Sequence, residues 1–474
     1  MRRIIFWGVG NIGSKIYEFT KKYGEYPDYW CDNDSLKWGT EKSGKTIISP
    51  QEVDYEQDVI FITCASCDAI EKQILELGGK KSNIIYADRE DSAELIAYMS
   101  EQIARFAQVH RPLNIHWREG ILFDLSGGLV LGGVERWCFQ SAQMLSDNNV
   151  QGGYLVPINA AVNIQENTFE VIRTGDIEDC INKILNCGYR CIVCNFPFEI
   201  MMAACIIKRY IAKDLKIILA IHNDHEKFYK MCELWNPYID EFWIISDVIE
   251  KKMMDIVSQP NKMKRIGWNV GPVENKKKEY FRDSKIRIGY AGRLTKTQKR
   301  VDLLIELAIS LKKRKVDYIL EIAGCGDAYD MLNEKMKWNS LEDSVILLGM
   351  LPHNEINHFW QDKDVYISCS EYEGHSISQV EAMSCGAVPV VTNTSGTSDD
   401  IVDGYNGFIV PIRDVEGLAE KVEYLYSHPE DISKFGQRAK QKIQESMDNY
   451  DNPFERIFPS ELQRRGIASR SEAW

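Results

Sequence analysis

The sequence predicts an α/β protein built from doubly wound parallel sheets. Short apolar runs alternate with longer mixed segments along the chain, which is the pattern of parallel strands covered by helices. The 474 residues are enough for about three domains, and 44% hydrophobic residues are enough to fill their cores. No stretch approaches the ~18–20 apolar residues that a membrane-spanning helix needs.

We divide the chain into three α/β units and a tail. The first unit covers residues 1–95, with strands at Arg3–Trp7, Tyr29–Asp32, Val59–Thr63 and Asn83–Ala87. A helix over Ser92–Val109 leads to the second unit, residues 113–280, with strands near Gly120–Ser126, Cys191–Phe196, Lys216–His222 and Glu241–Ser246. The third unit covers 281–440, with strands near Ile286–Ala291, Tyr318–Ala323, Val345–Leu348, Val365–Ser368, Val388–Thr392 and Gly407–Val410. We expect helix and loop in the tail, residues 441–474.

The charge of the chain argues against a nucleic-acid partner. The formal net charge is −13, whereas nucleic-acid binding needs a basic surface. Residues 251–300 are an exception, because 15 Lys and Arg stand there against 4 Asp and Glu, a local charge of +11. This segment is either a solvated linker or part of a phosphate site with a contact to anionic lipid. We favour the phosphate site, because cations of the proposed site fall within it.

The 13 cysteines indicate a reducing, cytoplasmic setting with free thiols, because no secretion signal is recognised. Two C-x-x-C pairs occur, Cys64 with Cys67 and Cys191 with Cys194. Both pairs fall in or at the end of expected strands, where residues three apart point to opposite faces. We therefore expect buried structural thiols and no metal site.

The strongest chemical signal is the segment Glu373-Gly-His-Ser-Ile-Ser-Gln-Val-Glu381-Ala-Met-Ser-Cys-Gly386. Ser376 and Gln379 have the spacing of a capping box, which predicts a helix that begins at Ile377. The free N–H groups of such a first turn, at Ser376, Ile377 and Ser378, stabilise a diphosphate without a metal ion. Glu373 and Glu381 then flank the ligand. The alternative is a capped surface helix with a solvated glutamate.

Two further segments would meet this helix at the edge of the sheets. Arg293 emerges after the strand that ends near Ala291, and Lys299 opens the next helix. Arg offers a fork and Lys a point charge to phosphate oxygens. The segment Ser126-Gly127-Gly128-Leu129-Val130-Leu131-Gly132-Gly133 permits close approach of backbone to a ligand. Taken singly, these features are also compatible with surface bases and a flexible loop.

Together the motifs resemble the retaining glycosyltransferases of family 4, which have the GT-B fold. The resemblance covers residues 120–440. It rests on Gly132-Gly133-Val134-Glu135-Arg136, on Gly292-Arg293-Leu294 with Lys299, on Glu373 with Glu381, on Cys385-Gly386 before Pro389, and on Asp403-Gly404-Tyr405-Asn406-Gly407. It implies two facing Rossmann-like domains with the active site in the crevice between them.

The resemblance also implies residue roles. Arg293 and Lys299 would neutralise the donor diphosphate, and the main chain at Ser376–Ser378 would bind its phosphate. Glu381 would hold the nucleotide ribose, and Glu373 would position the donor sugar. Two further positions would come from the second unit: Gly132-Gly133 would close over the substrates, and His222 would face the sugar. A strand-capping histidine is the alternative for His222.

The first unit carries a dinucleotide-binding fingerprint. Gly8, Gly10 and Gly13 follow the first strand, and Asp32 stands 19 residues after Gly13 at the tip of the next. The unit resembles the Rossmann-like module that some sugar-modifying enzymes append. Its glycines and Asp32 form a candidate accessory nucleotide site. We favour a degenerate domain used in regulation or assembly, because sugar transfer needs no nicotinamide.

The expected activity is retaining transfer of a sugar from a nucleoside diphosphate sugar, a UDP-sugar in the first instance, to a hydroxyl. The acceptor is expected to be a glycan or lipid-linked molecule of bacterial cell-surface polysaccharide synthesis, with peripheral attachment at the inner face of the membrane. No cofactor is expected beyond the donor. Three alternatives stay open: an NAD-dependent sugar-nucleotide oxidoreductase or epimerase, a non-catalytic nucleotide-sugar-binding protein, and a glycosyl phosphorylase.

Overall fold

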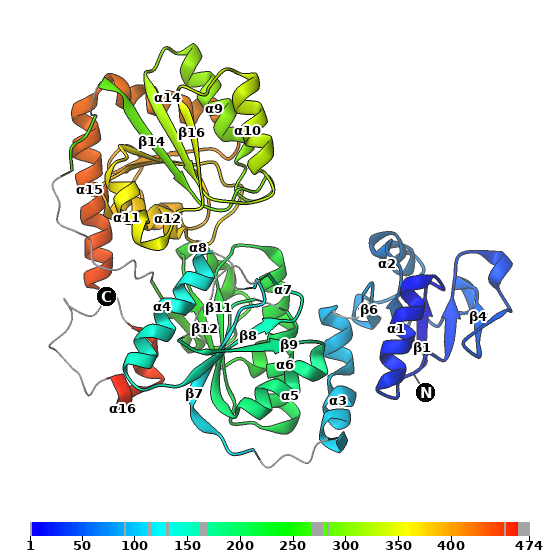
Figure 1. The fold of residues 1–474 in the computed structure, drawn as a ribbon. Coiled ribbons are helices and arrows are strands. Elements are labelled where there is room, and N and C mark those ends of the chain that lie inside the picture. Colours follow the sequence, from blue (N-terminus) through cyan, green and yellow to red (C-terminus); the bar gives the residue numbers. More distant parts are fainter. Residues whose placement is uncertain are drawn as a thin grey trace.

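The computed structural model describes residues 2–89, 92–110, 115–128, 132–161, 168–196, 198–267, 278–281, 284–449 and 452–462. Within these residues the strands form three sheets, whose pairings are parallel except for one small hairpin. Two lobes face each other, and a further domain lies beside the lower one (Figure 1). The predicted α/β class is confirmed, and residues 2–89 contain a separate N-terminal sheet.

The first sheet has the strand order β3-β4-β2-β1-β5-β6. Its strands are β1 (Ile4–Trp7), β2 (Tyr29–Cys31), β3 (Glu41–Lys42), β4 (Lys45–Ile48), β5 (Val59–Ile62) and β6 (Ile84–Tyr86). The helices are α1 (Asn11–Lys22), α2 (Cys67–Glu76) and α3 (Ala93–His110). The predicted strands are present, and the β3–β4 hairpin is an addition at the polar edge.

The second sheet has the order β13-β12-β11-β10-β7-β8-β9 and forms the lower lobe in Figure 1. Its strands are β7 (Arg118–Asp124), β8 (Gly152–Pro157), β9 (Glu170–Thr174), β10 (Tyr189–Cys194), β11 (Lys216–Ile221), β12 (Glu241–Ile244) and β13 (Met263–Arg265). Its helices are α4 (Gly133–Asp147), α5 (Ile177–Cys187), α6 (Glu199–Ile206), α7 (Glu226–Trp235) and α8 (Asp247–Met254).

The third sheet has the order β16-β15-β14-β17-β18-β19 and forms the upper lobe. Its strands are β14 (Ile286–Ala291), β15 (Tyr318–Ala323), β16 (Val345–Gly349), β17 (Val365–Ser368), β18 (Val388–Thr392) and β19 (Phe408–Val410). Its helices are α9 (Asp302–Lys313), α10 (Tyr329–Trp338), α11 (His353–Gln361), α12 (Ile377–Ser384), α13 (Thr397–Asp400), α14 (Val415–Ser427) and α15 (Pro429–Asp448).

The end of the described chain returns from the upper lobe to the lower one. Helix α15 runs through residue 440, so the boundary expected there falls inside a helix. After it come a 3₁₀ turn (Pro453–Arg456) and α16 (Pro459–Leu462), which lie at the lower lobe (Figure 1). The Phe454 ring contacts Phe123, Trp137 and Trp243 of that lobe, at centroid distances of 6.0, 5.9 and 5.2 Å. The tail therefore ties the two lobes together.

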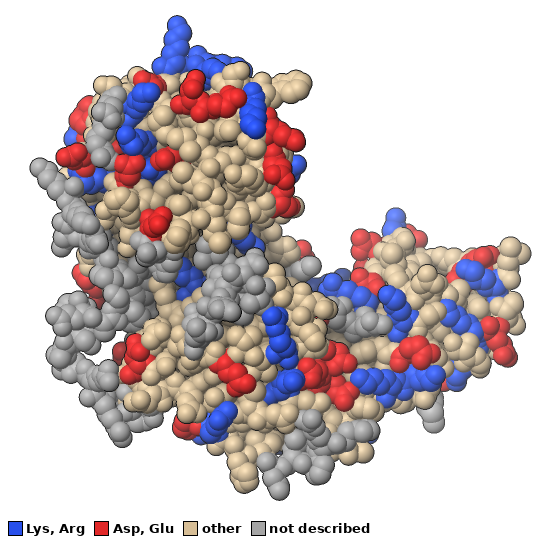
Figure 2. All heavy atoms as spheres, viewed as in Figure 1, with Lys and Arg blue, Asp and Glu red and all other residues tan. Residues whose placement is uncertain are grey.

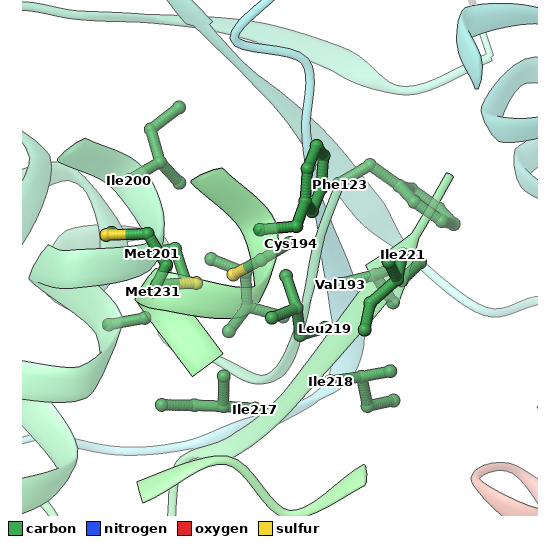
Figure 3. Close-up of a cluster of buried hydrophobic side chains, with 14 of the residues drawn as sticks. Phe123, Val193, Cys194, Ile200, Met201, Ile217, Ile218, Leu219, Ile221 and Met231 are labelled. Carbon is green, nitrogen blue, oxygen red and sulfur yellow. The ribbon is translucent and has the colours of Figure 1, made fainter. Parts of the chain in front are cut away.

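The hydrophobic core of the lower lobe is filled by branched and sulfur-containing side chains. Figure 3 shows the apolar side chains of β10 and β11 packed against those of α6 and α7. This core continues into the first domain through α3, whose buried Leu95, Met99 and Ile103 belong to the same cluster. The hydroxyl groups of Ser100 on α3 and Tyr210 of the lower lobe lie 3.3 Å apart. Burial of this shared face fixes the first domain to the lower lobe.

The two cysteine pairs differ in their surroundings. Cys191 and Cys194 lie buried in β10, as expected. Cys67 instead begins α2, after a strand that ends at Ile62, so Cys64 and Cys67 do not share a strand. The Cys67 thiol lies 3.1 Å from the Cys64 carbonyl oxygen. In the part of the chain that the structure describes, no group of His, Cys, Asp and Glu side chains is arranged to hold a metal ion.

No helix in the described ranges combines the length and the apolar character that crossing a bilayer requires.

Candidate active site

The candidate site lies where the carboxyl ends of the upper sheet meet the lower lobe. In Figure 1, α12 is at the base of the upper lobe and faces α4 and α8 of the lower one. Parallel strands place the loops that follow them along one edge, which is where open α/β sheets bind ligands. The loops after β14 and β17 both open at this edge because these strands are hydrogen-bonded neighbours.

Lys299 and Glu373 form an ion pair within the upper lobe. The Lys299 side chain is 17% exposed and the Glu373 side chain 10% exposed. The hydroxyl of Ser370, two residues beyond β17, donates to the same carboxylate oxygen at 2.7 Å. The structure thus brings together two residues that lie 74 positions apart, and it holds the carboxylate from two sides.

Arg293 lies in the loop after β14 and keeps an exposed side chain. Its Nη2 donates to Oε1 of Gln298 at 2.9 Å, and the Gln298 amide donates to the Tyr372 carbonyl at 3.3 Å. These bonds link the Arg293 loop to the Glu373 loop. The structure therefore places Arg293, Lys299 and Glu373 together, and Gln298, which the sequence analysis did not single out, connects them.

Helix α12 begins at Ile377, as predicted, but its cap differs from the predicted capping box. Ser376 occupies the N-cap position without a side-chain cap bond, and its hydroxyl lies 3.3 Å from the Tyr366 hydroxyl. The Gln379 amide donates to Asp400 at 3.3 Å instead of reaching back. Tertiary partners outcompete the local capping bonds here. The N–H groups at Ile377 and Ser378 have no bond within the helix, as in any first turn.

The glycine-rich segment of the lower lobe meets α12 directly. A Cβ atom at Gly133, the first residue of α4, would lie 3.1 Å from Cδ1 of Ile377. A Cβ at Gly132 would lie 2.2 Å from a carboxylate oxygen of Glu135. A small residue at Gly133 permits the close approach of the lobes, and glycine at Gly132 leaves room for the Glu135 carboxylate of the same lobe. Leu129–Leu131, between the glycine pairs, lie outside the described residues.

Glu381 is paired with Arg136 from the other lobe. The Arg136 guanidinium contacts the Glu381 carboxylate, and their side chains are 13% and 4% exposed. Burial lowers the pKa of Arg136 to about 10, so that it stays cationic at neutral pH. Arg136 stands in the sequence motif but was given no role there, because a contact between lobes leaves no local pattern.

Glu135, next to Arg136, is a second buried carboxyl at this junction. Burial raises the pKa of Glu135, while Arg293 of the upper lobe acts in the opposite direction. One turn of α4 therefore presents a carboxyl and a guanidinium toward the charged groups of the upper lobe.

His222 is buried at the end of β11, with its ring turned toward the lower lobe. Its Nε2 lies 2.8 Å from Oδ1 of Asn195, whose amide nitrogen donates to the Asp124 carbonyl at 2.8 Å. The amide orientation therefore makes Nε2 the protonated nitrogen of His222. Burial lowers the pKa of His222 to about 3, so the imidazole is neutral. A Cβ at Gly374 would lie 2.1 Å from the His222 carbonyl oxygen, which places His222 beside the Glu373 loop.

Further polar contacts hold the two lobes at this junction. The Ser395 hydroxyl of the upper lobe donates to Asp224 of the lower lobe, which Lys252 also pairs at 2.6 Å. Arg265 of β13 forms an ion pair with Asp399 of α13. These contacts join the two lobes through charged and polar side chains.

His375 and Asp400 form a buried pair behind α12, at 2.5 Å. Burial alone would lower the pKa of His375, but the Asp400 carboxylate outweighs it and raises this pKa above the ordinary value. The same contact lowers the pKa of Asp400 against its burial. Both shifts favour the ionic form of the pair, and the contact ties the loop between Glu373 and α12 to Asp400 of α13.

This pair predicts a pH dependence of stability. A raised histidine pKa stabilises the fold fully below the unfolded value of ~6.5, and the contribution is lost as pH rises through the folded pKa. We expect the free energy of unfolding of the wild type to fall as pH rises through that window. Urea unfolding from pH 6 to 9 measures it. Asp400→Asn should remove this fall in the free energy of unfolding, and His428→Gln, at an exposed site, should keep it. The same fall in Asp400→Asn would contradict the role of the His375–Asp400 pair.

The glycine-rich turn and Asp32 of the first domain are present, but their polar groups bond to residues of the same domain. Gly8, with φ +121°, and Gly13 pack so closely that a Cβ at Gly13 would lie 2.2 Å from the Gly8 carbonyl. The Asp32 carboxylate accepts from the Val9 and Asp34 N–H groups, at 3.4 and 2.9 Å, and pairs with Lys37 at 3.1 Å. The Lys42 ammonium donates to the carbonyls of Val9 and Gly10. Asp32 of the candidate accessory nucleotide site is thus held by groups of its own domain.

Solved structures with the same architecture are glycosyltransferases and related enzymes. The chain resembles Anabaena HepE in complex with UDP and glucose with a TM-score of 0.57 and 16% identity, covering 69% of this chain and 95% of that one. It resembles a Staphylococcus aureus TarM variant, in complex with fondaparinux, alpha-GlcNAc-glycerol and UDP, with a TM-score of 0.51 and 19% identity, covering 61% and 58%. The two facing lobes have the GT-B fold, as predicted.

Sequence comparison defines the upper lobe more closely. Residues 273–442 match the family described as "Glycosyl transferases group 1", so the chain contains a glycosyltransferase group 1 domain. Residues 1–85 match the family "C2185-like, N-terminal".

Curated relatives are similar over part of their length. A poly(ribitol-phosphate) alpha-N-acetylglucosaminyltransferase of Staphylococcus aureus (strain COL) is 30% identical over 166 residues, which is 35% of this chain and 33% of the relative. The putative glycosyltransferase EpsD of Bacillus subtilis (strain 168) is 31% identical over 179 residues, 36% of this chain and 45% of EpsD. The chain thus spans less than half the length of both.

Proposed function

We propose that this protein is a retaining glycosyltransferase that moves a sugar from a nucleoside diphosphate sugar to an acceptor hydroxyl. The observation that carries the proposal is the convergence of Arg293, the Lys299–Glu373 pair and the start of α12 at one edge of a glycosyltransferase group 1 domain. UDP is the first nucleotide to test, because HepE and TarM bind UDP in similar folds.

The chemistry follows from charge. Breaking the bond between sugar and diphosphate leaves additional negative charge on the leaving phosphate. Arg293 and the N–H groups at Ile377 and Ser378 are positioned before the reaction, so they would stabilise this charge without large rearrangement, and Lys299 lies beside them. For Lys299 to reach a phosphate, it has to share or exchange its contact with Glu373.

Glu373, Glu381 and His222 are assigned to the remaining parts of the donor. Glu373 would accept hydrogen bonds from the sugar, and Glu381 from the ribose. His222 would lie beside the sugar, with its neutral ring fixed by Asn195. We assign front-face attack in which the leaving phosphate oxygen accepts the acceptor proton, which gives retention without a covalent enzyme intermediate. Glu373 is therefore a positioning carboxylate in this mechanism.

The acceptor is proposed to be a glycan or a lipid-linked precursor of a cell-surface polysaccharide. The activity in the name of the S. aureus relative and the molecules bound to TarM support a glycan-type acceptor. We place the reaction in the cytoplasm, with peripheral attachment to the inner membrane face through the basic segment 251–300. Figure 2 shows Lys and Arg interspersed with Asp and Glu over the described surface of the viewed face.

A panel of nucleotide sugars tests the proposal. Each donor is incubated with the protein, with and without crude lipid-linked acceptor, and release of nucleoside diphosphate is measured. We expect one donor to give release that the acceptor stimulates. Binding without release would favour a non-catalytic protein, a requirement for inorganic phosphate would favour a phosphorylase, and a change in nicotinamide absorbance would favour an oxidoreductase.

Chelation makes a separate prediction. Because Arg293, Lys299 and the first turn of α12 supply the positive potential for the leaving group, we expect EDTA to leave the transfer rate within about twofold of the untreated rate. Initial rates with and without EDTA measure this. Loss of activity that Mg²⁺ or Mn²⁺ restores would contradict the metal-independent assignment.

A further inference from the structure

The Arg136–Glu381 ion pair has a consequence for donor binding, because it uses a group that the proposed function assigns to the ribose. Arg136 comes from α4 of the lower lobe and Glu381 from α12 of the upper lobe. With the guanidinium in contact, the Glu381 side chain is 4% exposed. A ribose hydroxyl cannot reach that carboxylate unless the guanidinium moves aside.

The pair is also the contact that makes burial of Glu381 tolerable. A carboxylate buried without a partner is strongly destabilised, and an opposite charge within contact distance offsets that cost. The start of α4 at Gly133 lies against Ile377 of α12, so the helix that carries Arg136 approaches the helix that carries Glu381. The Arg136 side chain is only 13% exposed, so it is a mostly buried counter-ion for Glu381.

We propose that Arg136 is an internal competitor of the donor nucleotide: it occupies Glu381, and a donor has to displace it before its ribose can bind there. This inference rests on the proposed function and adds to it a contact that the donor has to displace. The apparent affinity for nucleotide is then the intrinsic affinity reduced by the fraction of molecules in which Glu381 is free. Donor binding is coupled to release of a contact between the lobes.

Two substitutions that break the same ion pair should have opposite effects. In Arg136→Gln the carboxylate remains and its competitor is gone, so the Kd for UDP should fall by roughly tenfold. In Glu381→Gln the ribose acceptor is weakened, so the Kd for UDP should rise. A purely structural role of the pair would move both variants in the same direction. Isothermal titration calorimetry with UDP measures the Kd values, and thermal melting shows whether each variant is folded.

Arg265→Gln is the matched control, because it also removes an ion pair between the lobes, the one with Asp399, but leaves Glu381 untouched. Its Kd for UDP should stay within about twofold of the wild type. Arg136→Lys keeps the charge, so its Kd for UDP should lie closer to the wild-type value than that of Arg136→Gln. It is the variant to titrate if Arg136→Gln does not fold.

The outcomes separate this inference from the proposed function. If UDP binds the wild type and Arg136→Gln with the same Kd, or the variant more weakly, the competitor role is wrong and the proposed function stands. If neither protein binds UDP, both the competitor role and the proposed function are wrong for this nucleotide. Tighter binding in Arg265→Gln as well would show that loosening of the lobes, and not competition at Glu381, sets the affinity, and would overturn the inference.

Discussion

Glu373→Ala is expected to lower the rate of sugar transfer by roughly a thousandfold, about 4 kcal/mol of transition-state stabilisation. The carboxylate is held between Lys299 and the Ser370 hydroxyl, so it is positioned before a donor arrives. Its removal takes away the group that orients the sugar, but it frees the Lys299 ammonium for phosphate. Nucleotide binding should therefore be kept or tightened while kcat falls.

This split between binding and turnover distinguishes a role at the sugar from general damage. Steady-state kinetics give kcat, and calorimetry with UDP gives the Kd. Glu371→Ala is the matched control: Glu371 stands two residues away and pairs with Arg300 and Arg413 on the surface. It should retain wild-type turnover. Near-normal kcat in a folded Glu373→Ala protein would remove Glu373 from the site.

Lys299→Ala should have the second-largest effect, and Arg293→Ala an effect of similar size, each about 2–4 kcal/mol of transition-state stabilisation. Lys299→Ala also leaves Glu373 with its charge uncompensated in a largely buried place. That carboxylate would repel the diphosphate, so that both kcat and nucleotide affinity fall, in contrast to Glu373→Ala. Arg293 is more exposed, and its loss should act mainly through the missing phosphate contact.

Initial rates and UDP titrations on the two variants measure these effects. Lys296→Ala, which removes an exposed cation from the same loop, is the control for a general loss of positive potential and should change kcat by less than about twofold. Unaltered rates in both Lys299→Ala and Arg293→Ala would rule out their role at the diphosphate.

The interior strands and the start of α12 could be predicted because local pattern determines them. Val59–Ile62 and Val365–Ser368 are apolar runs buried on both faces of a parallel sheet, which is how such strands read in sequence. Strands β8 and β9, at one side of the second sheet, could not be predicted in this way. β8 starts with two glycines and ends at Pro157, and β9 includes Glu170 and Arg173. Their pairing depends on the neighbouring strand rather than on their own composition.

The convergence of Arg293, Lys299 and Glu373 could be anticipated, since loops that follow neighbouring parallel strands share one edge. The side chains that these residues contact could not be anticipated from the sequence. The Arg136–Glu381 pair depends on how two lobes meet, and the Gln379–Asp400 bond replaces a local cap with a tertiary one. Cys67 begins a helix after a strand that ends at Ile62, so the argument that Cys64 and Cys67 point to opposite faces of one strand does not apply to this pair.

The central claim is that the first turn of α12 binds the diphosphate of the donor. Hydrogen exchange with and without UDP tests it most directly, because the first-turn N–H groups of a helix exchange freely until a ligand takes them. We predict that UDP slows exchange at residues 376–378 and that uridine, which lacks the phosphates, does not. Protection confined to Gly8–Gly13 of the first domain, or equal protection by UDP and uridine, would contradict the claim.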